Sequence, residues 1–163
     1  MSRILTFLDN LKTHLAAGGS LLTEVEERHI LILSGDDPEQ EKVVDKHVQH
    51  HCMRSKGIGI VIYVDSGDNP NSGESGTLAL EVSFEVMLFL HPLKFGKTYD
   101  STKREALTIL EDLLRHLHWA SIEPVFERHY DRVTVESFEP LADDTYWAWN
   151  IPCKRRIPLA ASG

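Results

Sequence analysis

The sequence predicts an α+β fold, with a mixed, mainly antiparallel sheet, helices packed on one face and a long protruding hairpin. Three patterns support this class. An amphipathic helical pattern opens the chain at Ile4–Leu15, a continuous apolar run occupies 57–64, and strict two-residue alternation occupies Leu78–Leu90. The 163 residues suit one domain, so we expect a single domain spanning 1–163.

The first predicted element is a helix from Ser2 to about Ala17. Apolar residues fall on one stripe at helical spacing, with Phe7 beside it: Ile4, Leu8, Leu11 and Leu15. Gly18 and Gly19 can adopt the left-handed conformations that end a helix. Because the apolar stripe must be buried, we expect this helix to pack on the sheet.

A short strand and a second helix are predicted next. His29–Leu33 is a short, predominantly apolar run, and a turn sequence follows it. Asp37 has the character of an N-cap, Pro38 fits the first helical position, and Gln40 is placed as a capping-box partner. We therefore expect a helix from 38 to about 53. Its predicted apolar side has these residues on or near one face: Val43, Val44, His47, Val48 and His51.

The middle of the chain predicts a long antiparallel hairpin. Residues 57–64 are continuously apolar, typical of a central strand, and we interpret Gly57 and Gly59 there as marks of close packing. Asp65–Gly76 holds nearly every turn-forming residue type and no apolar one, so we expect an exposed loop. The returning strand buries alternate residues: Leu78, Leu80, Val82, Phe84, Val86, Leu88 and Leu90.

A third helix and two strands complete the prediction. Thr102 and Glu105 have capping-box spacing and open a helix to about His118. Its predicted buried stripe comprises Ala106, Leu110, Leu113, Leu114 and Leu117. Strands follow at Arg132–Phe138 and Thr145–Arg156, joined as a hairpin by 139–144. We expect the last residues, 159–163, to be disordered.

The composition is that of a globular protein with an acidic surface. The formal net charge is −8, which repels phosphate chains, so we expect no specific nucleic-acid binding. Three consecutive basic residues at 154–156 are interpreted as a strand end. No apolar segment is long enough to span a bilayer and no signal peptide is evident, so we expect a cytoplasmic protein without membrane contact. Cys52 and Cys153 do not suggest a disulfide scaffold.

The segment His47–Cys52 is the most suggestive cluster of chemically active side chains. Histidine and cysteine bind zinc, and i,i+4 spacing places His47 and His51 on one helical face. Cys52 lies one position further round the helix, so it need not converge with them, and further ligands are not evident. We therefore predict no metal site and no cofactor. Because no nucleophile elbow or phosphate loop occurs either, we predict no catalytic residue and no enzymatic activity.

Two further groups of residues have open or modest interpretations. His116 and His118 are interpreted as caps of the third helix's C-terminal carbonyls. Tyr146, Trp147 and Trp149 form an aromatic stripe in the last strand. That stripe packs either in the core or across a subunit interface, and the sequence leaves both alternatives open.

Four segments together resemble a known family. They are the amphipathic start Ile4–Leu15, the hairpin around Asp65–Gly76, the helix Thr102–His118 and the ending Asp144–Pro152. Their order resembles that of the tail terminator, or tail completion, proteins of long-tailed bacteriophages and prophages. The resemblance implies a homo-oligomeric ring, typically a hexamer, that caps the tail tube and docks to the head. Its implied partners are other copies of itself, the tail tube and head–neck proteins, in the host cell and then in the virion.

Two alternative functions stay open at this point. One is another ring component of the same machinery, such as a head–tail connector or a tail-tube-like protein. The other is a small cytoplasmic metal-binding protein or enzyme that uses His47, His51 and Cys52.

Overall fold

A computed structural model describes residues 2–16, 25–33, 39–68, 79–96, 104–125, 131–143 and 145–159. The helices are α1 (Arg3–Ala16), the 3₁₀ helix η2 (Glu27–His29), α2 (Gln40–Lys46), the π-helix η3 (His47–Met53) and α3 (Ala106–Leu117). The strands are β1 (Ile30–Leu33), β2 (Ile58–Asp68), β3 (Ala79–Leu90), β4 (Phe95–Gly96), β5 (Arg104–Glu105), β6 (Thr134–Val135), β7 (Glu139–Pro140) and β8 (Trp147–Pro158).

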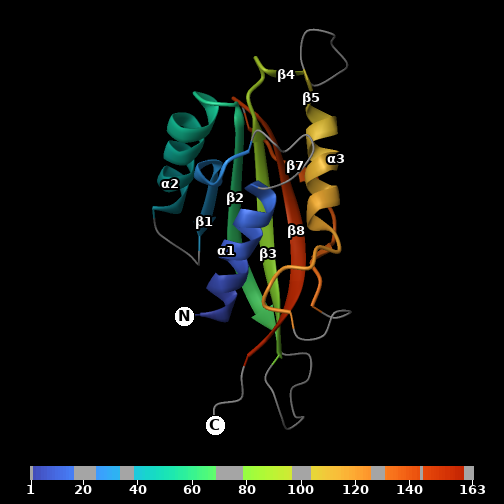
Figure 1. The fold of residues 1–163 in the computed structure, drawn as a ribbon. Coiled ribbons are helices and arrows are strands. Elements are labelled where there is room, and N and C mark those ends of the chain that lie inside the picture. Colours follow the sequence, from blue (N-terminus) through green and yellow to red (C-terminus); the bar gives the residue numbers. More distant parts are fainter. Residues whose placement is uncertain are drawn as a thin grey trace.

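The main sheet is mixed and mostly antiparallel, which confirms the predicted α+β class. Its strand order is β1-β2-β3-β8-β6, and β7 also pairs with β8 (Figure 1). β1 runs parallel to β2, whereas the pairings of β2 with β3 and of β3 with β8 are antiparallel. β1 therefore forms one edge, and the short strands β6 and β7 form the other.

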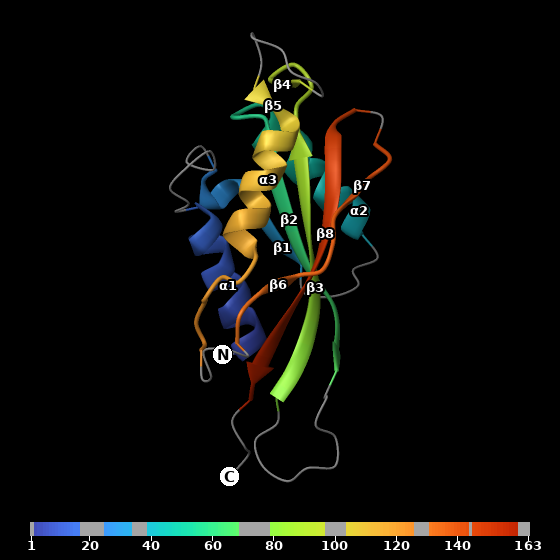
Figure 2. The same cartoon turned by 90° about the vertical axis from the view of Figure 1, so that its right-hand side faces the viewer.

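The predicted hairpin is confirmed, but its first strand, β2, is longer than expected. β2 and β3 pair from Ile58 opposite Leu90 to Asp68 opposite Glu81, and this end of the hairpin extends beyond the helices (Figure 2). The expected loop 65–76 is therefore wrong for 65–68, while 69–76 lies outside the described residues. A register shift between Val64 and Ser66 lets this polar segment continue the backbone pairing with its side chains exposed.

The helices cover both faces of the sheet, so the prediction that they pack on one face is wrong. α1 and α3 lie on one face, and α2 with η3 lies on the other (Figure 2). The second face has its own small core: Val48, Cys52, Met53, Val61, Phe89 and Ala148. The physical reason is that β2 is apolar on both sides, so both of its faces need a cover.

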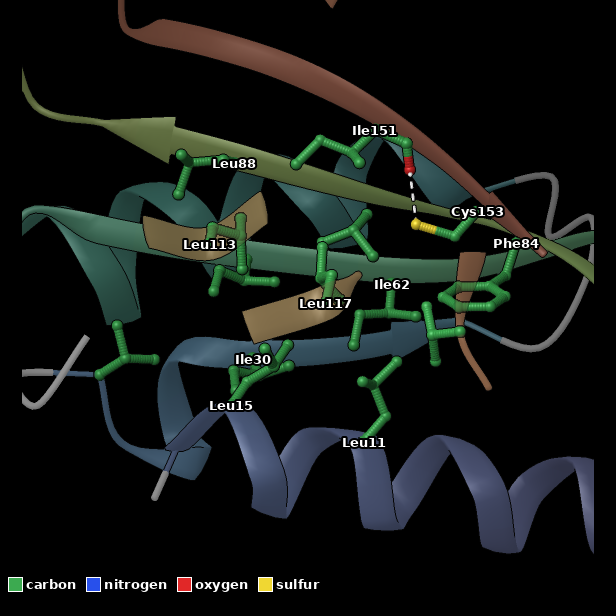
Figure 3. Packing of buried hydrophobic residues seen from close by; sticks show 14 of the residues in the cluster. Leu11, Leu15, Ile30, Ile62, Phe84, Leu88, Leu113, Leu117, Ile151 and Cys153 are labelled. Atoms are coloured by element: carbon green, nitrogen blue, oxygen red, sulfur yellow. Dashed lines mark hydrogen bonds between the residues drawn. The ribbon is translucent and has the colours of Figure 1, made fainter. Parts of the chain in front are cut away.

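The main core confirms the predicted buried stripes of α1 and β3. Phe7, Leu8, Leu11 and Leu15 of α1 are buried, as are the alternate residues of β3: Val82, Phe84, Val86, Leu88 and Leu90. Figure 3 shows Leu11 lying toward Ile62 and Leu15 beside Ile30, with Leu113 and Leu117 of α3 in the same cluster. Each such fully buried side chain stabilises the fold by roughly 1.5–3 kcal/mol relative to exposure.

The two glycines at the start of β2 serve close packing, as predicted. A Cβ atom on Gly59 would lie 3.0 Å from both the Cβ and the Sγ of Cys52, so only glycine lets η3 approach the strand this closely. Gly57 has a φ of +77°, a left-handed conformation that other residues rarely adopt.

The last third of the chain departs most from prediction. α3 begins at Ala106. The proposed capping residue Thr102 lies outside the described residues. The same holds for other residues named in the predictions: Gly18, Gly19, Asp37, Pro38 and 160–163. The predicted α3 stripe is mostly correct, although Ile109 is also buried and Leu114 only partly.

The expected strand Arg132–Phe138 is reduced to the two-residue strand β6, and a second short strand, β7, follows it. Thr134 pairs with Lys154 in β6, and Glu139 pairs with Asn150 in β7, so the two registers differ by one residue. β7 therefore lies within the segment that we expected to connect the two strands. An interrupted edge strand tolerates Pro140, which has no N–H to donate.

Candidate functional site

The geometry of the π-helix η3 determines which residues of the His47–Cys52 cluster lie close together. The Nε2 of His47 lies 3.3 Å from the Sγ of Cys52 and 3.0 Å from the carbonyl oxygen of His29. All three of these residues are buried, whereas His51 is exposed. A π-helix places residues five apart above one another, so Cys52 meets His47. The sequence had indicated only that Cys52 need not converge with the histidines.

The chemistry of this pair is that of a packing contact. Burial raises the pKa of the Cys52 thiol to about 12, so it stays protonated at neutral pH and is a poor nucleophile and metal ligand. Burial also lowers the pKa of His47. In the described parts of the chain, no three side chains of the His, Cys, Asp and Glu types are grouped so that they could hold a metal ion.

His29 joins three elements and was missed as a special residue by sequence reasoning. Its Nδ1 accepts a hydrogen bond from the N–H of Glu26, its Nε2 lies 3.3 Å from the Oγ of Ser55, and its carbonyl accepts from His47. An imidazole nitrogen that accepts from an amide is unprotonated, so this ring is neutral. A histidine at the start of an otherwise apolar run was the available signal.

The three basic residues 154–156 interact with other groups of the same protein, which agrees with their interpretation as a strand end. Lys154 forms ion pairs with Glu136 (3.1 Å) and Glu81 (3.6 Å), and Arg156 contacts Asp131 at 3.1 Å. The guanidinium of Arg155 is buried, donates to the carbonyls of 122, 124 and 131, and lies 4.9 Å from the ring of Phe7. The sequence did not indicate this burial.

The histidines at the end of α3 also have local partners. The Nδ1 of His116 lies 2.9 Å from the carbonyl oxygen of Asp112, inside the helix, so this contact is not the capping of the last carbonyls that we expected. The carbonyl oxygen of His116 itself lies 3.0 Å from the Nε2 of His14 in α1. The Nδ1 of His118 instead accepts from the N–H of Val135 and so ties the helix end to β6. This second role was not expected.

A largely apolar cavity of about 530 Å³, which we term the aromatic groove, lies between the first turn of α3 and the β7–β8 end of the sheet. It is lined by Ala106, Leu107, Pro140, Leu141, Ala142, Asp143, Tyr146, Trp147, Ala148 and Trp149. Trp147 and Trp149 also pack against the main core, and the Nε1 of Trp147 donates to the carbonyl of Phe95 at 2.8 Å. The aromatic stripe therefore contributes to the core and also lines an open surface.

Further large apolar side chains are exposed on α3, just after it and just before β7. Leu107 is 48% exposed, Phe138 is 52% exposed and Trp119 is 51% exposed. Trp119 follows α3 with a φ of +64°, a conformation that costs on the order of 1 kcal/mol in a bulky residue. Its N–H donates to the carbonyl of Val133 at 2.7 Å, and the guanidinium of Arg132 lies 5.7 Å from its ring centroid. These contacts hold a strained, exposed tryptophan in place.

The opposite edge of the sheet carries a different surface. A cavity of about 460 Å³ next to β1, which we term the basic groove, is lined by Lys12, Glu27, Arg28, Ile30, Leu31, Val43, Lys46, His47 and His51. Three of these side chains, Lys12, Arg28 and Lys46, are cationic, against the one carboxylate of Glu27. One of them, Arg28, is paired with Glu26 at 2.8 Å.

No protein-family model matches the sequence, and no curated protein matches it significantly. In the described parts of the chain, none of the helices combines the length and the apolar character needed to cross a bilayer.

Proposed function

We propose that this protein is a structural assembly protein of a bacteriophage or prophage tail, which forms an oligomeric ring that ends the tail tube and joins it to the head. In this role it acts by contact with copies of itself, with the tube and with head–neck proteins. Its binding surfaces, and no catalytic group, then carry the function.

The arrangement of elements supports this proposal. An amphipathic helix (α1) and a second helix (α3) cover one face of the sheet, the β2–β3 hairpin extends beyond the helices, and β8 closes the sheet. This is the layout that the resemblance to tail terminator proteins implies. Because a shared layout does not dictate function, the proposal also needs a surface that could assemble.

The observation that carries the proposal is the aromatic groove with its exposed neighbours. Leu107, which lines the groove together with Trp149, is 48% exposed, and the exposed Phe138 directly precedes β7 at the wall of the groove. Proteins that act alone rarely expose grouped large apolar side chains, whereas binding interfaces use tryptophan and other aromatic residues as anchors. This surface therefore fits a protein that works in an assembly.

The proposal is tested by measuring native mass across a concentration series and by incubating the protein with purified tail tubes, followed by negative-stain imaging. We expect closed rings, and density added at one end of each tube. Stacks of rings would instead indicate a tube-like protein, and binding to heads alone would indicate a connector. A protein that stays monomeric even with tubes would refute the proposal.

A matched pair of variants shows whether the groove is responsible. Leu107→Asp places a charge in the groove wall, and Leu5→Asp places one at a comparably exposed leucine on α1 outside the groove. We expect Leu107→Asp to abolish tube binding and Leu5→Asp to retain it, with both variants folded.

A further inference from the structure

We infer that the aromatic groove of one copy receives the basic groove of a second copy, so that the chain associates head to tail through the two opposite edges of its sheet. This inference rests on the self-association in the proposed function and names the two surfaces that make the contact.

The placement of the two grooves is the first argument. The basic groove adjoins β1 and the aromatic groove adjoins β7 and β8, and these strands lie toward opposite edges of the main sheet (Figure 1). A contact between two different surfaces leaves one of each free on every pair. Such a contact therefore continues from copy to copy until the chain of subunits closes into a ring or grows as a filament.

Charge complementarity is the second argument. Asp143 lines the aromatic groove, and Glu139 lies exposed in the adjoining strand β7. The basic groove presents Lys12 and Lys46. The chain as a whole carries a formal charge of −8, so two copies repel one another on average. The half-exposed Lys12 and the exposed Lys46 therefore give the basic groove a charge complementary to Asp143 and Glu139 at the aromatic groove of another copy.

Apolar side chains in both grooves also favour contact between the two surfaces. Ile30, Leu31 and Val43 lie in the basic groove, among its charged residues. The wall of the aromatic groove offers Leu141 and Trp149 to such side chains. Apolar anchors surrounded by complementary charges are the arrangement found in specific interfaces.

A symmetric contact between two aromatic grooves is less favourable. It would place Glu139 and Asp143 of both copies against one another, and like charges brought together in an interface weaken binding. The same argument applies to two basic grooves, because Lys12 and Lys46 would then meet their own counterparts.

Two variants, each blocking one edge, test the inference. The aromatic-edge variant carries Leu107→Lys and Glu139→Lys, and the basic-edge variant carries Lys12→Glu and Lys46→Glu. Each is examined by light scattering, alone and mixed in equal amounts, beside the wild type. The control variant carries Arg54→Glu and Arg115→Glu, which changes exposed charges at positions that line neither groove. Melting curves establish that all four proteins are folded.

The head-to-tail arrangement predicts a distinctive result. Each edge variant alone should be monomeric, with the dissociation constant raised about a hundredfold or more. The mixture should form dimers and nothing larger, because it keeps one intact aromatic groove and one intact basic groove. The control should assemble like the wild type.

Other results would overturn the inference, and they distinguish its failure from a failure of the proposed function. If the wild type assembles and either edge variant alone still forms dimers, a symmetric contact is present and the head-to-tail pairing is wrong. If both variants assemble fully, neither groove is the interface. If the wild type itself stays monomeric, alone and with tail tubes, the proposed function fails as well.

Discussion

The Nε2 of His47 lies 3.3 Å from the Sγ of Cys52, five residues later in the chain. An α-helix would have turned these two side chains apart, and the π-helical turn brings them together. The contact lies under the second face of the sheet, where Gly59 leaves room for Cys52.

Neither cysteine should react with thiol reagents in the folded protein. Burial raises the pKa of both Cys52 and Cys153 to about 12. The thiolate is the reactive form, so a shift from 9 to about 12 reduces its amount at pH 8 by about a thousandfold, before any loss of access. The reaction with a chromogenic disulfide should therefore be slow until denaturant is added, when both thiols react. Rapid labelling of one thiol in the native protein would contradict this prediction.

Gly59→Ala should destabilise the protein by about 1–3 kcal/mol, because the new Cβ would lie 3.0 Å from Cys52. Gly67→Ala is the matched control, since a Cβ there would lie 3.9 Å from the carbonyl oxygen of Glu81, an ordinary contact. Urea unfolding of both variants measures the difference. A loss of unfolding free energy for Gly59→Ala no larger than that for Gly67→Ala would show that η3 does not pack tightly against β2 at Gly59.

How far the sequence predicted the fold depends on how local each pattern is. The stripes of α1 and β3 were correct because their periods are properties of consecutive residues, from Leu8 to Leu15 and from Val82 to Leu90. The packing of α2 and η3 on the second face was not predicted. The sequence of β2 contained an indirect signal, because a strand that is apolar on both sides, with Gly59 inside it, requires a close neighbour on each face.

The candidate sites were harder to predict because they depend on contacts between distant segments. Leu107 and Trp149 both line the aromatic groove, and no single window of sequence contains both residues. The stripe around Trp149 was recognised, but whether it faced the core or a surface depended on where α3 lies. The π-helix at His47–Met53 left no periodic signal, since one turn is too short to distinguish from an α-helix.

The protein should lose stability as the pH falls below about 6.5, and His29 should be one cause. Burial lowers the pKa of His29, and the nearby charge of Arg28 lowers it further. The unfolded chain therefore binds a proton that the folded chain resists. The contribution of His29 is fully present above the unfolded pKa of 6.5 and is lost as the pH falls towards the folded value.

The variant His29→Gln removes this titration and keeps a group that can accept from the N–H of Glu26. We expect its free energy of unfolding to vary less between pH 7.5 and 5 than that of the wild type. His47, whose pKa is also lowered by burial, accounts for part of what remains. Denaturant titrations at several pH values measure both slopes, and each histidine adds at most about 1.4 kcal/mol per pH unit. Identical slopes in the two proteins would rule out a role for His29.

Arg155 should matter far more to stability than its neighbour Lys154, although both are cations of one strand. Arg155 is buried and donates hydrogen bonds to three backbone carbonyls, of Ile122, Pro124 and Asp131. Burial lowers its pKa to about 10, so the group still carries its charge at neutral pH. Arg155→Met would leave these carbonyls without their donor, at a cost of about 3 kcal/mol or more.

Lys154→Met is the natural comparison, because Lys154 forms exposed ion pairs that solvent screens. Chemical unfolding of both variants, and amide exchange around 122–125, should show a large loss and local opening for Arg155→Met only. The buried guanidinium then serves to hold the segment 122–125 against β8, close to the ring of Phe7. Equal, small losses in the two variants would mean that water replaces the guanidinium at these carbonyls without cost.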